Sequence, residues 1–311
     1  KTWTKLATNG LVDPAKADHY RIDGTSLPLI REPVKVEFSN GTGTSSETRE
    51  YWSTSAGPVI HRANGKIYII KTANDGEFRG GEQFLRMMHA TSLDQWKSAM
   101  RLHGRGTSNF TYADQAGNIL LVWNAALPLL PHVTGGDTLA IPVKFTSDMW
   151  TQYVPWDSLP QFLNPKGGYV HNENSSPHFT NVREKVDTTN KYPNFEKPSF
   201  SLRSQLGLQL VGGTNKVSLE DVVRMKHSYR MLLADRVKPD LLSAVKATSP
   251  TGDVAAALAL MERWDNTATP DSRGAMLFEI WWQRYGTGLA DSLRYTRAWT
   301  STDPARTPYG L

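Results

Sequence analysis

Residues 150–177 read WTQYVPWDSLPQFLNPKGGYVHNENSSP and form the most distinctive stretch of the sequence. They lie within a longer segment, residues 127–199, that is rich in Pro, Gly, Asn and Ser. Irregular segments of this length are uncommon inside compact chains, and they are usually linkers or functional surfaces. The many aromatic residues of this segment argue against a linker. We therefore expect residues 127–199 to form a long loop that carries function.

The part of the chain before this loop predicts antiparallel strands. Residues 34–38 (VKVEF) alternate apolar and polar side chains, and residues 40–43 (NGTG) supply turn residues. Because residues 48–53 are again extended, a hairpin with a long tip is expected. Residues 57–60 and 66–71 predict another pair of strands on the same grounds.

Helical signals appear on both sides of the loop. Ser92 precedes apolar residues spaced three and four apart, and we expect it to cap a helix that begins at Leu93. Ser218 predicts the start of a helix that continues through Leu233, and Ser272 predicts the start of another. Strands, then a long loop, then helices are compatible with the α+β class.

The composition is that of a folded globular protein, and it excludes several kinds of site. The 311 residues include ten Trp and no Cys, so this sequence holds no disulfide, thiolate zinc site, iron–sulfur cluster or cysteine nucleophile. The 35 basic and 30 acidic residues give a net charge of +5, but no basic run of the kind that binds nucleic acid is present. The longest apolar stretch, residues 118–133, is too short and too polar to span a membrane.

Familiar catalytic and metal-binding motifs are absent from the sequence. It contains no HExxH, P-loop, GxSxG or GxGxxG pattern, and its eight histidines are scattered. His171 and His178 lie seven residues apart in the loop. We interpret them as exposed loop histidines rather than as metal ligands.

Residues 150–177 nevertheless resemble the signature of a known enzyme family. The matching positions are Leu159-Pro160, Asn164-Pro165, Gly168-Tyr169-Val170, Asn172, Asn174 and Ser176-Pro177. Supporting matches lie at residues 20–27, 57–58, 109–123, 263–265 and 274–281. In this spacing the chain resembles the penicillin acylase family, N-terminal-nucleophile amidohydrolases that include acylases for acyl-homoserine lactones and for lipopeptides such as aculeacin. The resemblance covers essentially the whole chain.

The resemblance implies a fold and a place in a longer protein. The expected fold is the four-layer αββα fold of N-terminal-nucleophile hydrolases, only partly contained in this chain. Residues 1–199 would belong to the core, with the active-site loop at 127–199, and residues 200–311 would form a mainly helical lobe. Family precursors cut themselves, and the new amino-terminal serine of the β chain is the nucleophile. Since this chain begins with Lys1, the resemblance makes it an internal part of the β chain, with the serine supplied upstream.

Two catalytic residues follow from the family pattern. Asn174 occupies the position of the asparagine that stabilises the oxyanion, and a side-chain amide supplies the N–H donors for that role. Arg203 falls where family members have an arginine that orients this asparagine, and its planar fork suits the task. From the residues alone, Asn172 and Asn174 are equally explained as turn caps, and Arg203 as a surface arginine of a helix over residues 201–210.

Two acyl-pocket residues follow from the same resemblance. Phe84 falls where penicillin acylases have a pocket aromatic, although core packing explains it equally well. Ser108 falls where one of them has a branched aliphatic residue. The smaller serine would leave room for a longer or bulkier acyl chain.

The expected function is hydrolysis of an acyl amide of a small molecule, such as a β-lactam, an acyl-homoserine lactone or a lipopeptide. Roles in quorum quenching or antibiotic resistance would follow from such substrates. No cofactor is expected to be required, and the calcium of the family has no ligand that we place in this sequence. The expected partners are the α chain and the remaining β-chain segments, and the expected location is periplasmic or secreted. The alternative is an inactive family member that binds acylated ligands.

Overall fold

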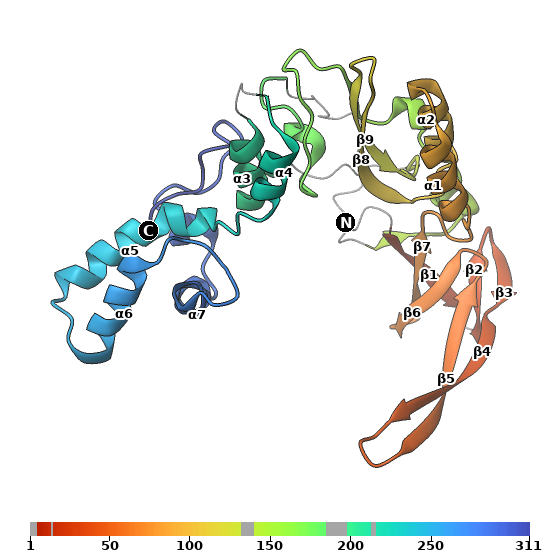
Figure 1. Ribbon diagram of the computed structural model, residues 1–311. Coiled ribbons are helices and arrows are strands. Elements are labelled where there is room, and N and C mark those ends of the chain that lie inside the picture. The colour runs from red at the N-terminus through yellow and green to blue at the C-terminus, as the bar shows by residue number, and fades with distance from the viewer. Residues whose placement is uncertain (1–4, 14, 132–139, 185–197, 213–215) are drawn as a thin grey trace. The chain divides into compact units, whose positions relative to one another are not determined.

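The computed structural model describes residues 5–13, 15–131, 140–184, 198–212 and 216–311. The chain divides into two compact units. Figure 1 colours the chain by residue number, from red at the N-terminus to blue at the C-terminus. The first comprises residues 1–170 and 181–197, and the second comprises residues 171–180 and 198–311. The short segment 171–180 therefore belongs with the C-terminal helices. The expected division of the assembled fold at residue 199 stays a prediction.

A large, mainly antiparallel sheet forms the base of the first unit. Its strands follow the order β3-β2-β1-β7-β6-β5-β4, and β10 pairs with β1 in parallel. The strands predicted at residues 34–38, 48–53, 57–60 and 66–71 are confirmed, whereas the remaining strands of this sheet lie outside those ranges. The strands are β1 (Lys5–Asp13), β2 (Lys16–Ile22), β3 (Thr25–Pro28), β4 (Ile30–Ser39), β5 (Thr44–Thr54), β6 (Gly57–Ala63), β7 (Lys66–Thr72) and β10 (Ile141–Pro142).

The β4–β5 hairpin is longer than the sequence pattern predicts, and it extends as a two-stranded arm from the sheet (Figure 1). Its ladder continues to the pair Ser39 and Thr44, so the expected long tip is wrong and only residues 40–43 turn. The Asn40 side chain holds this turn, because its oxygen accepts from the Thr42 N–H at 3.1 Å and its amide donates to Ser45 Oγ at 2.6 Å. The Ser- and Thr-rich start of β5 therefore pairs instead of lengthening the loop.

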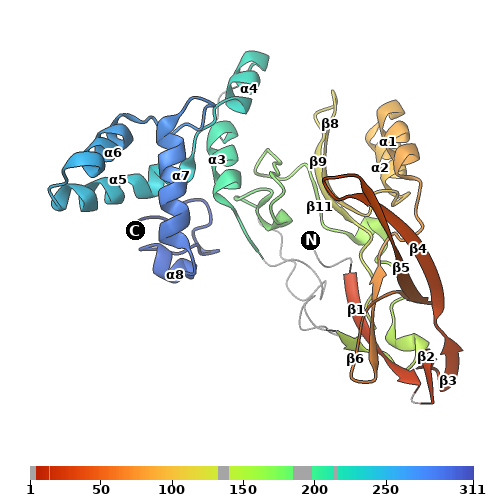
Figure 2. The same ribbon diagram turned by 90° about the horizontal axis from the view of Figure 1, so that it is seen from below.

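A second, three-stranded sheet carries a pair of helices on one face. Its strands are β11 (Gln161–Leu163), β9 (Ile119–Ala125) and β8 (Thr107–Ala113), with β9 in the centre and almost wholly buried. Helices α1 (Gly80–His89) and α2 (Leu93–Met100) lie side by side in both views and cover this sheet (Figures 1 and 2). Ser92 accepts from the Gln95 N–H at 3.2 Å, which confirms the predicted N-cap of α2. The largest hydrophobic core contains Trp96, Met100, Leu120, Val122, Trp123, Leu127 and Trp156.

The long loop is irregular wherever the structure describes it, as predicted. In the described residues between β9 and residue 201, the loop contains only β10, β11 and three single-turn helices, η1 (Thr146–Asp148), η2 (Trp156–Ser158) and η3 (Pro177–Phe179). Buried side chains hold it in place. The Trp156 indole N–H, for example, donates to Asn124 Oδ1 of β9 at 3.0 Å.

The second unit is helical. Its helices are α3 (Leu202–Val211), α4 (Leu219–Lys226), α5 (Leu232–Ala247), α6 (Gly252–Arg263), α7 (Arg273–Gly286) and α8 (Asp291–Arg294). Helices α5 and α6 lie side by side and α7 packs against them, around a core that includes Val237, Met261, Trp264 and Phe278 (Figure 2). Ser218 and Ser272 accept from backbone N–H groups of α4 and α7, so both predicted caps are confirmed.

The prediction of one continuous helix from Ser218 through Leu233 is wrong, because α4 ends at Lys226 and a separate helix, α5, begins at Leu232. Tyr229 adopts a left-handed conformation, with φ of 49°. The Met231 N–H then donates to the Asn266 carbonyl at 2.8 Å instead of to a carbonyl of α4. Within the described residues, no helix is both long and apolar enough to cross a bilayer.

Candidate functional site

Residues 171–180 form a tight loop that is fixed at its base to the core of the second unit. The two ends of the loop meet where the His171 N–H donates to the Thr180 carbonyl at 3.3 Å. The buried Phe179 ring packs on Phe200 and Trp299, with ring centroids 5.4 and 6.0 Å apart. This base holds the polar residues between its ends in a defined position.

Asn174 lies at the exposed turn of this loop. Its φ of 62° is left-handed, a conformation that Asn tolerates better than most residues. The Asn172 side chain stabilises the turn, because its oxygen accepts from the Asn174 N–H at 2.8 Å and its amide donates to the Ser175 carbonyl at 3.0 Å. The turn-cap interpretation therefore describes Asn172, whereas the Asn174 side chain has a different partner.

That partner is Arg203, in the first turn of α3. One guanidinium nitrogen, Nη2, donates to Asn174 Oδ1 at 2.9 Å and also to the Glu173 carbonyl oxygen. A guanidinium has no acceptor, so the amide atom that faces it is the oxygen. The Asn174 Nδ2 amide group, with two N–H donors, then points away from Arg203. It has no hydrogen-bond partner among the described residues, and its residue is exposed.

Two further residues of the loop form a buried contact that sequence reasoning missed. His171 is only 7% exposed, so the interpretation as an exposed loop histidine is wrong. Its Nδ1 lies 3.1 Å from Glu173 Oε2, and its ring packs edge-on against Phe200. The available signal was the spacing of two residues between the imidazole of His171 and the carboxylate of Glu173.

His178 makes its contact with Ser176 rather than with other metal-ligand side chains. Its Nδ1 hydrogen-bonds Ser176 Oγ, and Ser176 is buried. In the described part of the chain, no three His, Asp or Glu side chains converge as they would around a metal ion.

The two predicted pocket residues belong to the first unit. Phe84 on α1 is 45% exposed and contacts Phe110, with ring centroids 6.0 Å apart. Ser108 and Phe110 are two residues apart on β8 and so share one face of the strand. Ser108 Oγ donates to the Thr107 carbonyl at 2.5 Å and accepts from Arg105 Nε at 3.3 Å. The structure thus brings Phe84 and Ser108 to the same helix-to-sheet layer, and the half-exposed Phe84 is not a core residue.

The turn before α1 carries the carboxyl group with the most clearly displaced pKa in this layer. Hydrogen bonds from the Arg79 guanidinium, and then from its backbone N–H, lower the pKa of Glu77 to about 2. Glu77, Arg79 and His103 line one surface pocket, and burial lowers the pKa of His103. Glu77 is therefore ionised throughout the neutral range.

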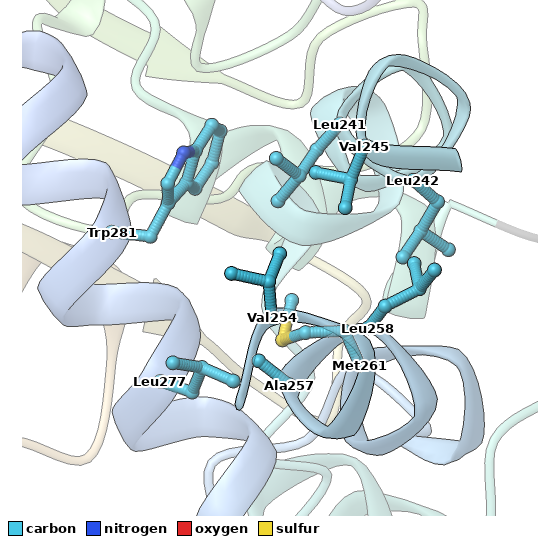
Figure 3. A pocket seen from close by; sticks show the side chains of 9 residues that line it. All are labelled: Leu241, Leu242, Val245, Val254, Ala257, Leu258, Met261, Leu277 and Trp281. Atoms are coloured by element: carbon cyan, nitrogen blue, oxygen red, sulfur yellow. The ribbon is translucent and has the colours of Figure 1, made fainter. Parts of the chain in front are cut away.

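A separate apolar cavity lies within the second unit. Figure 3 shows the side chains that surround it, contributed by α5, α6 and α7, and its volume is about 120 Å³. They are Leu241, Leu242, Val245, Val254, Ala257, Leu258, Met261, Leu277 and Trp281. Because this lining is almost entirely apolar, the space is a packing feature of the second unit.

Comparisons with known proteins point to one family. The family model described as penicillin amidase matches residues 7–307. An acyl-homoserine lactone acylase, PvdQ, of Pseudomonas putida is 24% identical over 96% of this chain and 41% of its own length. Aculeacin-A acylase of Actinoplanes utahensis is 26% identical over 95% of this chain and 42% of its own. The chain thus spans about two fifths of the length of these relatives.

A solved structure shares the fold. The thermostable penicillin G acylase from Alcaligenes faecalis matches with a TM-score of 0.61 and 18% identity, over 97% of this chain and 56% of that one. This match and the mixture of sheets and helices confirm the predicted fold class, of which the chain contains a part.

Proposed function

The chain belongs to the penicillin amidase family, and from this premise we propose that it is part of an acylase that hydrolyses the acyl amide bond of a small molecule. The observation that carries the proposal is the orientation of Asn174 by Arg203. Relatives named as acylases for acyl-homoserine lactones and aculeacin A support the substrate class.

Asn174 supplies oxyanion stabilisation in this proposal. When a nucleophile attacks an amide carbon, the carbonyl oxygen becomes negative, and a preorganised N–H donor stabilises that charge most in the transition state. The exposed Nδ2 group is such a donor, and Arg203 fixes its orientation by donating a hydrogen bond to Oδ1 of the same amide. No rearrangement of the amide is then needed as the charge develops. The loss of one such donor costs about 2.7 to 4 kcal/mol in the transition state.

The nucleophile is proposed to come from outside these residues. An amino-terminal serine, with its own α-amine as base, would attack the amide carbon and form an acyl-enzyme as the C–N bond breaks and the protonated amine leaves; water would then hydrolyse the ester and release the free acid. The net reaction consumes one water molecule and involves no oxidation or reduction, so the proposed reaction needs no cofactor. We also propose that the α chain and the rest of the β chain pack on this chain in the periplasm or in the secreted protein. The exposed apolar side chains of the β4–β5 arm, among them Val34, Phe38 and Tyr51, support such packing.

The test uses the assembled, processed protein and a panel of acyl amides. We expect release of free amine from acyl-homoserine lactones, aliphatic lipopeptide amides or penicillins, measured with an amine-reactive fluorophore. Asn174→Asp keeps the size of the side chain but removes both N–H donors, so it should abolish most of the activity. Hydrolysis that is absent for every amide, in a correctly assembled protein that still binds acylated ligands, would favour the alternative of a binding module.

A further inference from the structure

The carboxylate of Glu173 is tied to the core of the second unit. Its Oε1 and Oε2 atoms lie 3.2 and 3.1 Å from Nδ1 of the buried His171. The His171 ring in turn packs against Phe200, with centroids 5.8 Å apart. A residue next to the exposed Asn174 is thereby anchored through its side chain to buried residues at the base of the loop.

The same carboxylate lies directly on the backbone of α3. A Cβ atom at Gly207 would lie 2.6 Å from Glu173 Oε1, so any other residue there would require the Glu173 carboxylate to shift. Gly207 and Arg203 are four residues apart and hence share one face of the helix. Arg203 binds the Glu173 carbonyl oxygen and the Asn174 side chain. Glu173 and Asn174 therefore both lie against one face of α3. The Glu173 carboxylate lies next to Gly207, and the Asn174 amide lies next to Arg203.

We propose that Glu173 is a positioning residue for Asn174. Its carboxylate, held between His171 and the Gly207 face of α3, fixes the left-handed turn from which the Asn174 amide projects. This inference rests on the proposed function, because it assigns a role to Glu173 only through the donor group of Asn174. It also accounts for the carboxyl group of Glu173 pointing inward from a turn whose next residue is exposed.

The experiment compares variants of the assembled enzyme on one acyl amide substrate. Glu173→Ala should lower kcat about tenfold or more with KM changed less than about threefold, because misplacing an oxyanion donor affects the transition state selectively. Glu173→Gln keeps the length and a hydrogen-bond acceptor for His171, and it should stay within about threefold of wild-type kcat. Gln209→Ala, at an exposed position of the same helix, is the matched control and should leave kcat unchanged.

A double variant separates positioning from general structural support. If Glu173 acts through Asn174, then Glu173→Ala should cause no further loss of kcat in an Asn174→Ala background. Gly207→Ala provides a second approach from the helix side, should Glu173→Ala fail to assemble. It should lower kcat in the wild type but cause little further loss in the Asn174→Ala background, because its effect also acts through the Asn174 amide.

Three outcomes would overturn the proposal: wild-type kcat in Glu173→Ala, equal losses in Glu173→Gln and Glu173→Ala, or multiplicative losses in the double variant with Asn174→Ala. The Asn174→Ala variant distinguishes failure of this inference from failure of the proposed function. If Asn174→Ala alone retains full activity, the proposed function is wrong. If it loses activity while Glu173→Ala does not, only the positioning role is wrong.

Discussion

The Arg203 guanidinium donates a 2.9 Å hydrogen bond to the side-chain oxygen of Asn174, which lies 29 residues earlier in the chain. This contact decides which end of the amide is available. Because Arg203 occupies the oxygen, the exposed end is the Nδ2 donor, which is the end that an oxyanion requires. The second bond of Arg203, to the Glu173 carbonyl, fixes the backbone beside the same amide.

The first prediction concerns the donor itself. Asn174→Ala in the assembled enzyme should lower kcat by about 100- to 1000-fold, because it deletes a hydrogen bond that is made in the transition state. The melting temperature should change little, since the Asn174 side chain is exposed. Steady-state kinetics and a thermal melt measure the two effects. A kcat within tenfold of wild type would remove Asn174 from the site.

The second prediction concerns the geometry of Arg203. Arg203→Lys should impair kcat nearly as much as Arg203→Ala. The planar guanidinium fixes the directions of the two Nη2 hydrogen bonds to the Asn174 oxygen and the Glu173 carbonyl, whereas an ammonium group on a flexible stem does not. Arg224→Lys on α4, where an exposed arginine pairs only with Asp221 among the described residues, is the matched control. Full activity of Arg203→Lys, measured as kcat, would support a simple surface role.

Much of the local fold could be predicted because its signals are local. Ser92, Ser218 and Ser272 mark helix starts since each side chain bonds a backbone N–H three residues ahead. The end of α4 could not be predicted in this way. It depends on the backbone bond from Met231 to Asn266, residues that are far apart in the sequence.

The residues of the site likewise divide into those that the sequence could predict and those that depend on tertiary contacts. Asn174 and Arg203 were found because a family pattern supplies their spacing, not because either residue is unusual in itself. The part played by Gly207 had no local signal, because glycine inside a helix costs about 1 kcal/mol relative to alanine and is simply disfavoured there. Only the approach of the Glu173 carboxylate, fixed by tertiary packing, accounts for it.

The third prediction is a pH dependence of stability that arises from Glu77. Its folded-state pKa of about 2 lies below the ordinary value of 4.5. A lowered carboxyl pKa stabilises the folded state above the unfolded pKa, and this stabilisation is lost as the pH falls through the folded pKa. Glu77→Gln should therefore lower the melting temperature at pH 7, and the difference from wild type should shrink as the pH falls from about 4.5 toward 2.

Thermal melts of the assembled protein at several pH values measure this difference. Glu32→Gln is the control, because Glu32 is exposed and has no ion-pair partner in the described ranges. A difference for Glu77→Gln that stays constant from pH 7 to pH 2 would contradict the assignment to its ionisation.

The fourth prediction uses the cavity of the second unit. Ala257→Leu would place three more carbons in the apolar space of about 120 Å³. The variant should raise the free energy of unfolding by about 1 kcal/mol, since burial gains are partly offset by repacking. Ala256→Leu, at the exposed neighbouring position, should change it by less than about 0.5 kcal/mol. Chemical denaturation measures both, and a destabilised Ala257→Leu would mean that the space cannot admit the side chain.

The fifth prediction concerns the acyl chain, and it rests on the layer that holds Phe84 and Ser108. If Ser108 lines the acyl pocket, the small side chain leaves space that additional methylene groups can fill. Each buried methylene gains about 0.8 kcal/mol, so kcat/KM should rise about fourfold per carbon from short acyl groups until the space is full. Ser108→Trp should reverse this order by occupying the space next to Phe110, while Asn174 and Arg203 continue to act on short substrates.

The measurement is kcat/KM over a series of acyl amides of increasing chain length. A preference for acetyl or phenylacetyl amides that Ser108→Trp leaves unchanged would place Ser108 outside the pocket and leave Phe84 as the only pocket residue that the family pattern supplies.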